Sequence, residues 1–206
     1  LGIALLQAGV GLQRPLLGLR AEDAGFASVT AALVMSAYYA GFLLGTRYIG
    51  RLLSEVGHIR TFAGLASTAS SIVLLQGLWI SPIPWGICRL IFGICTAALY
   101  VVAESWLNDV TTNQDRGRVL SVYMVVAVGA TTIGQYSVAF ASTAGFTLFA
   151  IASVLVSMAL VPVALSRRST APTVVPQPVT FRKLYSVVPT GLIVCWLTGM
   201  TLGSFI

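Results

Sequence analysis

The sequence is poor in charge, and above all in acidic and metal-binding side chains. Of its 206 residues 9% are charged, six are Asp or Glu, and His58 is the single histidine. A structural zinc site takes about four nitrogen, sulfur or oxygen ligands. The three cysteines, Cys88, Cys95 and Cys195, lie apart inside apolar runs and form no CxxC pair. We therefore expect no metal site, and we interpret the cysteines as small buried apolar residues.

Groupings of reactive side chains are also missing. A Ser-His-Asp arrangement would depend on His58, which we expect to be solvated in a short polar connector with no acid placed beside it. The GxxxxGK[ST] loop that binds nucleotide phosphates is absent. No two acidic residues form a pair within an apolar segment. The sequence therefore predicts that the chain is not an enzyme and uses no cofactor.

Apolar side chains are abundant. Hydrophobic residues make up 57% of the chain, and the mean hydropathy is +0.90. A soluble domain needs a largely polar surface, so this composition indicates a protein embedded in a lipid bilayer. The net charge of +6 is spread over short gaps between apolar runs. This distribution is typical of membrane topology signals and argues against a nucleic-acid partner.

Seven apolar segments are each long enough to cross the bilayer as a helix, which takes about 20 residues. Each is too long for a barrel strand and lacks strict alternation. The predicted fold class is therefore an all-α polytopic membrane protein. The segments lie near residues 1–19, 27–49, 61–80, 84–106, 118–140, 145–165 and 187–206.

Basic residues are concentrated in alternate connectors. The odd-numbered connectors hold only Arg20. The even-numbered connectors and the N-terminus are therefore predicted to be cytoplasmic. The even-numbered connectors and their flanks hold nine of the twelve basic residues, namely Arg47, Arg51, Arg60, Arg116, Arg118, Arg167, Arg168, Arg182 and Lys183.

Three domains follow from this layout. Residues 1–166 are predicted to form a six-helix transmembrane bundle, and residues 167–184 a cytoplasmic linker with three prolines. Residues 185–206 would be the next helix. The first and last residues read as the interior of a span, so we expect the chain to be part of a longer protein. Small residues four apart predict close helix packing at Gly41/Gly45, Ala130/Gly134 and Gly199/Gly203.

Three stretches resemble the major facilitator superfamily. The segment from Gly50 to Arg60 resembles the signature loop G-x-L-x-D-R-x-G-R-R. The segment Arg89–Gly93 resembles the R-x-x-Q-G motif, with Phe92 in place of Gln. Glu104-Ser-Trp-Leu-Asn108, followed by Arg116-Gly-Arg118 and Tyr123-Met, is similar to the YcaD-like bacterial branch. In the signature loop Gly50, Leu52 and Gly57 match, Ser54 and Glu55 replace the Asp and Arg, and His58 and Arg60 supply the basic end.

The resemblance implies a secondary active transporter of the bacterial inner membrane. This chain would supply the N-terminal half and the first helix of the C-terminal half, and the protein would move a small solute by alternating access. The G-x-x-x-G-P-x-x-G-G motif of drug antiporters is absent from the fifth span, which argues against that branch. The alternative is a non-transporting accessory or assembly subunit of a larger membrane complex, with other membrane subunits as partners.

Polar residues within the spans are candidates for substrate binding. Arg89 lies about five residues inside the fourth span, or roughly 8 Å from its end. A cation at that depth usually faces a cavity or a partner. Anion binding, support of a proton relay, a structural hydrogen bond and snorkelling to the membrane surface all remain open. For Arg14 the alternative is an arginine that reaches the outer lipid headgroups, and for the polar uncharged residues it is interhelical hydrogen bonding. The substrate-binding candidates are Arg14, Arg89, Gln13, Gln135 and Tyr136.

A second set of residues is predicted to gate the cytoplasmic side. Glu104 is expected to pair with Arg60 or Arg118, and an ion pair of this kind can hold one transport state and break in the other. A static pair that only fixes the connectors is the alternative. The gating candidates are Gly50, Glu55, Gly57, Arg60, Glu104 and Arg118.

Overall fold

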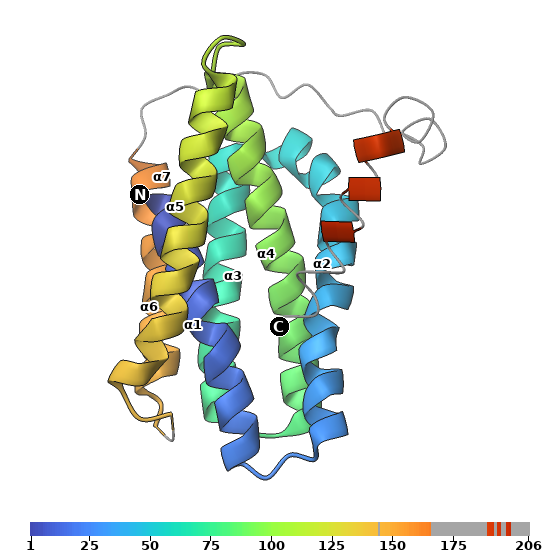
Figure 1. The fold of residues 1–206 in the computed structure, drawn as a ribbon, viewed down its shortest axis with the longest axis vertical. Helices are drawn as coiled ribbons and strands as arrows, with labels where there is room; N and C mark the ends of the chain where they lie inside the picture. Colours follow the sequence, from blue (N-terminus) through green and yellow to red (C-terminus); the bar gives the residue numbers. More distant parts are fainter. Residues whose placement is uncertain (144, 166–188, 192, 195–196, 199–206) are drawn as a thin grey trace. The chain divides into compact units, whose positions relative to one another are not determined.

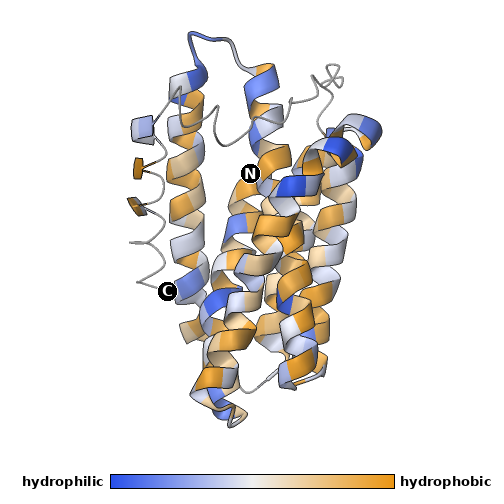
Figure 2. Ribbon diagram, turned by 90° about the vertical axis from the view of Figure 1, so that its right-hand side faces the viewer, coloured by the Kyte–Doolittle hydropathy of each residue, from blue (hydrophilic) through white to orange (hydrophobic). Residues whose placement is uncertain are grey.

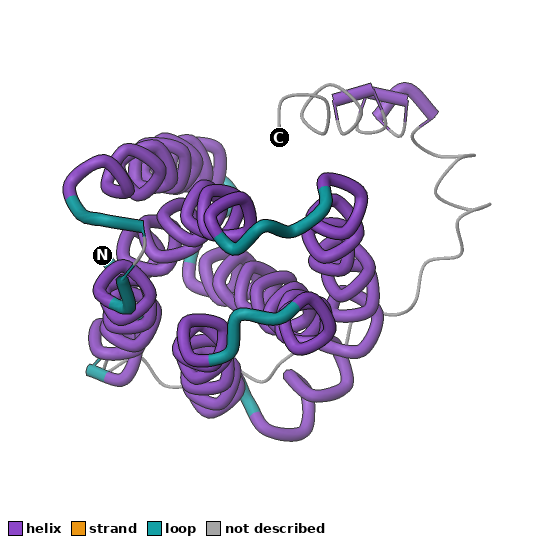
Figure 3. Tube along the Cα trace, turned by 90° about the horizontal axis from the view of Figure 1, so that it is seen from below, coloured by secondary structure: helices purple, strands orange, loops and turns teal. Residues whose placement is uncertain are grey.

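The computed structural model describes residues 1–143, 145–165, 189–191, 193–194 and 197–198. All regular elements among these residues are helices, as Figure 3 shows along the helix axes, which confirms the all-α fold class. The elements with defined bounds are α1 (Gly2–Asp23), α2 (Ser28–Val56), α3 (His58–Leu78), α4 (Pro82–Val110), α5 (Arg116–Ser137), the short 3-10 helix η1 (Val138–Phe140), α6 (Thr147–Met158) and α7 (Leu160–Ala164).

Five helical stretches are long and apolar enough to span a membrane: α2, α3, α4, α5 together with η1, and α6 together with α7. The described residues thus supply five of the seven predicted spans by these criteria. Helix α1 has 22 residues but is not among the five, because Gln7, Gln13 and Arg14 lower its hydropathy. Most of the predicted seventh span, 187–206, lies outside the described residues. In Figure 2 apolar residues dominate the lengths of the helices, and hydrophilic residues concentrate near their ends.

The predicted sixth span is interrupted near its end. Helix α6 ends at Met158 and α7 begins at Leu160. Pro162 has no backbone N–H and so cannot donate to the carbonyl of Met158, four residues earlier. The interruption therefore follows from the proline, and together α6 and α7 still provide an 18-residue span.

Successive helices run in alternate directions. In Figure 1 the α2–α3 junction and the α4–α5 connector lie at the upper end of the helices, and the α1–α2 and α3–α4 connectors at the lower end. A contact of 3.6 Å between His58 and Asp109 confirms that the first two share one end. We call this upper end the connector end. It carries the basic connectors of residues 54–60 and 108–118, as predicted.

The helices pack in a pattern that repeats within the bundle. The most extensive contacts join α2 to α4 and α1 to α5, followed by α3 to α4, α1 to α6 and α3 to α6. The helices correspond in the order α1 with α4, α2 with α5 and α3 with α6. Under this correspondence the α1–α5 pair matches the α4–α2 pair, and the α1–α6 pair matches the α4–α3 pair. Because α1 and α4 run in opposite directions, the pattern is that of an inverted repeat of three helices.

Glycines allow the closest of these approaches. A Cβ atom on Gly93 of α4 would collide with the backbone carbonyl of Tyr38 of α2, and one on Gly41 with that of Leu90. In the α1–α5 pair, Gly134 lies in the same way against the carbonyl of Ala8. The small residues predicted at 41 and 134 are therefore confirmed as points of close helix packing, whereas 199 and 203 lie outside the described residues.

The chain divides into two compact units, Leu1–Val174 and Val175–Ile206. Helices α1 to α7 belong to the first unit. In the second, the described residues 189–191, 193–194 and 197–198 are helical. The linker 167–184 lies outside the described residues, and the predicted domain boundaries stay predictions.

Candidate functional site

Arg89 lies buried between helices at the level predicted from the sequence. It follows the start of α4 at Pro82 by seven residues, and only 5% of it is exposed. Its guanidinium carbon lies 4.6 Å from the centre of the Tyr38 ring of α2, a cation–π contact. The close approach of α2 and α4 at Gly93 places this tyrosine beside the arginine. Burial excludes the snorkelling alternative for Arg89 in this structure.

Arg89 has no hydrogen bond or ion pair with any described residue. Its Nε atom is buried without an acceptor. The hydroxyl of Tyr38 is also buried, close to the side chains of Arg14 and Thr96 but without a hydrogen bond of good geometry to either. A guanidinium has five N–H donors, and leaving a buried donor unpaired costs about 1–3 kcal/mol, more for a charged group. The structural hydrogen bond considered for Arg89 is thus absent among the described residues. The cation contacts an aromatic ring and retains its capacity for hydrogen bonding.

Arg14 of α1 belongs to the same region. It interacts electrostatically with Tyr38, Arg89 and Tyr100. Tyr100 of α4 donates a hydrogen bond to Oε1 of Gln7 of α1, with an O–O distance of 2.6 Å. The side chains of α1, α2 and α4 therefore meet in a polar cluster, which we call the arginine cluster: Gln7, Arg14, Tyr38, Arg89 and Tyr100.

The other three substrate-binding candidates lie elsewhere. Gln13 is fully buried, and its Nε2 donates to Oε1 of Gln76 of α3 at 2.7 Å. Nε1 of Trp85 donates to the backbone carbonyl of Gln76 at 2.9 Å and so holds the end of α3 against the start of α4. For Gln13 the structure thus shows the interhelical hydrogen bond. Gln135 and Tyr136 are exposed near the end of α5, and no described contact joins them to the arginine cluster.

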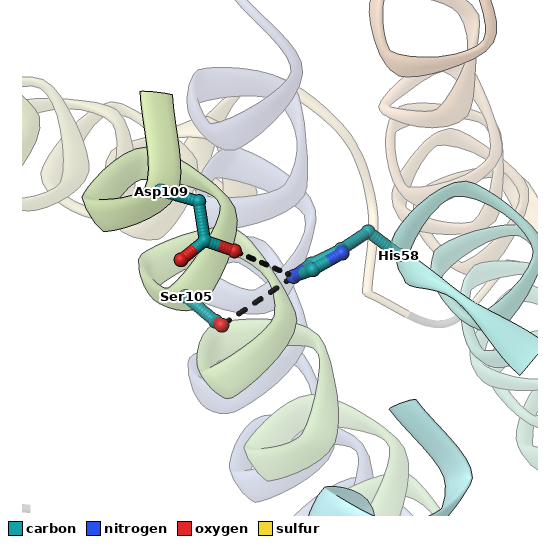
Figure 4. A network of polar contacts seen from close by, with 3 residues as sticks. All are labelled: His58, Ser105 and Asp109. Atoms are coloured by element: carbon teal, nitrogen blue, oxygen red, sulfur yellow. Dashed lines mark hydrogen bonds and ion pairs between the residues drawn. The ribbon is translucent and has the colours of Figure 1, made fainter. Parts of the chain in front are cut away.

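A second polar cluster lies at the connector end. Figure 4 shows His58 from the start of α3 pointing toward Ser105 and Asp109 on α4. Its Nε2 is 3.4 Å from Oγ of Ser105 and 3.6 Å from Oδ2 of Asp109. His58 is 3% exposed, so the expectation that it is solvated was wrong. The reason is that α3 begins directly after Gly57, which turns the histidine inward against α4 instead of leaving it in a loop.

Gly57 is a gating candidate with a clear backbone role. It joins α2 to α3 alone, with a φ of 85°, in the left-handed region that favours glycine. Its N–H donates to the carbonyl of Leu53 at 3.0 Å and so closes α2. The remaining candidates of the predicted signature loop lie in helices: Gly50 and Glu55 in α2, and Arg60 in α3. Glu55 and Arg60 are exposed, and Gly50 is half-buried.

Glu104 makes a different contact from the one expected. The hydroxyl of Tyr123 on α5 donates to its Oε1 at 3.1 Å. Within the described residues Glu104 forms no ion pair with Arg60 or Arg118, both of which are exposed. The carboxylate therefore links α4 to α5, and the two arginines remain at the surface.

Several residues of both clusters were not singled out from the sequence. Tyr38 and Tyr100 read as ordinary apolar residues of a span, and only their pairing with Arg89 and Gln7 reveals their place. The pairing of His58 with Asp109 carried one usable signal, because both residues stand at predicted ends of spans on the same side.

Comparison with known proteins identifies the family. The family model described as Major Facilitator Superfamily matches residues 1–206. The chain belongs to the Major Facilitator Superfamily. It is also similar to proteins named "Uncharacterized MFS-type transporter YcaD" from Salmonella arizonae, Salmonella newport and Salmonella typhimurium. Each is 33% identical over 138 residues, which cover 65% of this chain and 35% of the relative.

These matches confirm the resemblance to the superfamily and to its YcaD-like members. Together with the apolar helices, they show a multi-pass membrane protein. The match covers about a third of the length of each relative, and the relatives are named as transporters without a stated substrate. The superfamily is one of transporters rather than enzymes, in keeping with the sequence.

Proposed function

We propose that the chain is part of a secondary active transporter of the bacterial inner membrane, which moves a small solute by alternating access. The observation that carries this proposal is Arg89, a buried cation with unpaired hydrogen-bonding capacity inside an apolar helix. Ionisable residues at such depth are costly, and in membrane proteins they mark the path of a solute or ion. Membership of a transporter superfamily supports the same function.

In this proposal the arginine cluster contacts the solute from the first half of the protein. Arg14 and Arg89 come from α1 and α4, which correspond to each other in the inverted repeat. In transporters built from such repeats the solute binds near the middle of the membrane, between the repeats. Gln135 and Tyr136, which are exposed near the end of α5, would contact the solute only outside the arginine cluster. Gln13 would act indirectly, by holding α1 against α3.

The connector end would form the cytoplasmic gate, with the N-terminal end of α1 on the same side. The contacts of His58 with Asp109 and of Tyr123 with Glu104 join α3, α4 and α5 at this end. Contacts of this kind at helix ends can hold one of two packed arrangements and break in the other. Gly57 would fix the geometry of the turn between α2 and α3. The C-terminal half of the transporter would be faced by the other gating candidates, Gly50, Glu55, Arg60 and Arg118.

Uptake into liposomes tests the proposal. The full-length protein is reconstituted, incubated with a mixture of small solutes and compared with protein-free liposomes by mass spectrometry. We expect saturable uptake of at least one solute, and about a tenfold or greater loss of its initial rate in Arg89→Ala, since a charged hydrogen bond is worth about 1.5–3 kcal/mol. Arg20→Ala, at the end of α1, is the matched control and should retain the rate.

Two results would contradict the proposal. Unchanged uptake in Arg89→Ala would remove Arg89 from the transport path. Absence of uptake, combined with stoichiometric co-purification of another membrane subunit and no stabilisation by any solute, would favour the accessory subunit instead.

A further inference from the structure

The arginine cluster contains two cations and no carboxylate. All six acidic residues of the sequence lie in connectors or within two turns of a helix end: Glu22, Asp23, Glu55, Glu104, Asp109 and Asp115. Arg14 precedes the end of α1 by nine residues, and Arg89 follows the start of α4 by seven. At 1.5 Å per residue, both arginines lie roughly 10–14 Å from the same end of the helices. The chain itself therefore supplies no counter-charge at this level.

Two like charges in an apolar interior repel each other, and each also loses its hydration. The electrostatic interaction between Arg14 and Arg89 is of this unfavourable kind. The ring of Tyr38 lies 4.6 Å from Arg89 and offsets part of the cost, but a cation–π contact is worth only about 0.5–2 kcal/mol. An anion between the two arginines would offset the charge of both. It would also accept hydrogen bonds from the unpaired Nε–H of Arg89 and from the hydroxyl of Tyr38.

The Tyr38 ring that contacts Arg89 belongs to a group of aromatic side chains. The ring of Tyr38 lies 6.0 Å from Phe42 and 6.2 Å from Phe92, and Phe42 lies 6.2 Å from Tyr100. Such rings contact apolar groups and exclude water, which strengthens a nearby pairing of opposite charges. A small, fully hydrated anion would gain little from these rings. An anion that carries an apolar body would use both features of the site.

We propose that the arginine cluster binds an organic anion, in which a carboxylate or similar group lies between Arg14 and Arg89 and an apolar body contacts the aromatic rings. Arg89 offers the planar donor pair that matches a carboxylate, and the Tyr38 hydroxyl offers a further donor. This inference rests on the proposed function, since the cluster is the solute site of that proposal, and it adds the chemical class of the solute.

Thermal denaturation of the full-length protein in detergent tests the inference without any measurement of transport. The probes are benzoate and its neutral counterpart benzamide, with inorganic phosphate as an anion without an apolar body. We expect benzoate to raise the melting temperature saturably. Benzamide and phosphate should each bind at least about tenfold more weakly, because one lacks the charge and the other the apolar contact. Equal shifts for benzoate and benzamide, or no shift with benzoate, would overturn the inference.

Three variants place the binding at the arginine cluster. Arg89→Gln should weaken benzoate binding by about tenfold or more, and Arg89→Lys should restore part of it, since lysine keeps the charge but not the planar donor pair. Arg20→Gln is the matched control and should bind benzoate as the unmodified protein does. If Arg89→Gln does not fold, Arg14→Gln provides the same comparison from α1. Retained benzoate binding in whichever of the Arg89→Gln and Arg14→Gln variants folds would overturn the inference.

The inference and the proposed function can fail separately. Saturable benzoate binding that depends on Arg89, without uptake of any solute into liposomes, would leave the anion site in place and remove transport. Uptake of a neutral solute with no response to benzoate would leave transport in place and remove the anion site.

Discussion

Two regions of the bundle differ in how their polar side chains are satisfied. At the connector end, His58 contacts Ser105 and Asp109, and Glu104 accepts a hydrogen bond from Tyr123. In the arginine cluster, the Nε of Arg89 and the hydroxyl of Tyr38 are buried without partners. Both regions join helices that are far apart in the sequence, and the arginine cluster does so through the hydrogen bond from Tyr100 to Gln7, but only in the arginine cluster does a buried cation lack an acceptor.

The difference indicates what each region is built for. Buried polar groups in folded proteins are nearly always hydrogen-bonded. The Nε of Arg89 and the hydroxyl of Tyr38, which lack hydrogen bonds and lie near a second cation, therefore need an explanation. Paired groups stabilise the arrangement of helices that contains them. Unpaired groups destabilise the empty protein and reserve their interaction energy for a bound solute. Removal of an unpaired group from the arginine cluster should therefore raise the free energy of unfolding, whereas removal of a paired group at the connector end should lower it.

The largest effect should come from the glycine that brings Tyr38 to Arg89. In Gly93→Ala the new Cβ would collide with the backbone carbonyl of Tyr38, which neither helix can relieve by moving a side chain. We expect the free energy of unfolding in detergent to fall by about 1–3 kcal/mol. The matched control is Gly86→Ala on the same helix, where a Cβ meets no atom within 4 Å. There alanine should raise stability by up to about 1 kcal/mol. Equal effects of the two changes would contradict the close packing of α2 on α4.

Arg89→Met should raise the free energy of unfolding, whereas substitutions of paired groups at the connector end should lower it. Methionine removes a buried cation without an acceptor and keeps an apolar side chain of similar length. We expect the free energy of unfolding of the ligand-free protein to rise by about 1 kcal/mol, since replacing poorly compensated buried charge is often stabilising. SDS titration in detergent measures the change. A loss of stability of similar size would show that Arg89 has a structural partner and would break the comparison.

The sequence predicted the parts of the fold that depend on local composition. Segments rich in apolar residues became helices, the basic connectors lie at one end, and Gly41 lies at a close contact of two helices. It did not reveal the inverted repeat, because that pattern consists of contacts between helices and leaves no visible identity between α1 and α4. The interruption at Ala159 was open to prediction, since Pro162 stands four residues after Met158.

The site was predictable to the extent that charge is rare in an apolar span. Arg14 and Arg89 stood out for that reason, and the structure brings both to one cluster. Their aromatic partner Tyr38 could not be inferred, since the register of α2 against α4 is set by glycine contacts far apart in the sequence. His58 was misplaced because a one-residue turn reads from sequence as a polar loop.

At the connector end, Tyr123→Phe should have the larger of two destabilising effects. Phenylalanine keeps the ring and removes the hydroxyl that donates to Glu104 at 3.1 Å. Loss of a hydrogen bond to a charged acceptor should lower the free energy of unfolding by about 1 kcal/mol, which is below the range of about 1.5–3 kcal/mol for such bonds because the pair is only partly buried. Tyr136→Phe, an exposed tyrosine on the same helix, is the matched control and should change stability very little. Equal values for the two variants would remove the Glu104 contact from the set that stabilises the connector end.

The smallest effect should be the coupling between His58 and Asp109. The two atoms are 3.6 Å apart, and the Asp109 side chain is 37% exposed, so solvent weakens their interaction. The variants His58→Ala, Asp109→Ala and the double change form a double-mutant cycle that isolates this pair from the packing of each side chain. We expect a favourable coupling of about 0.5 kcal/mol in the free energy of unfolding.

The same cycle on initial uptake rates separates a gate from a static link: a gate that must open should give faster or unchanged rates in the single variants despite their lower stability. Rates that fall in proportion to stability would make the contact purely structural, and the connector end would then differ from the arginine cluster in pairing alone.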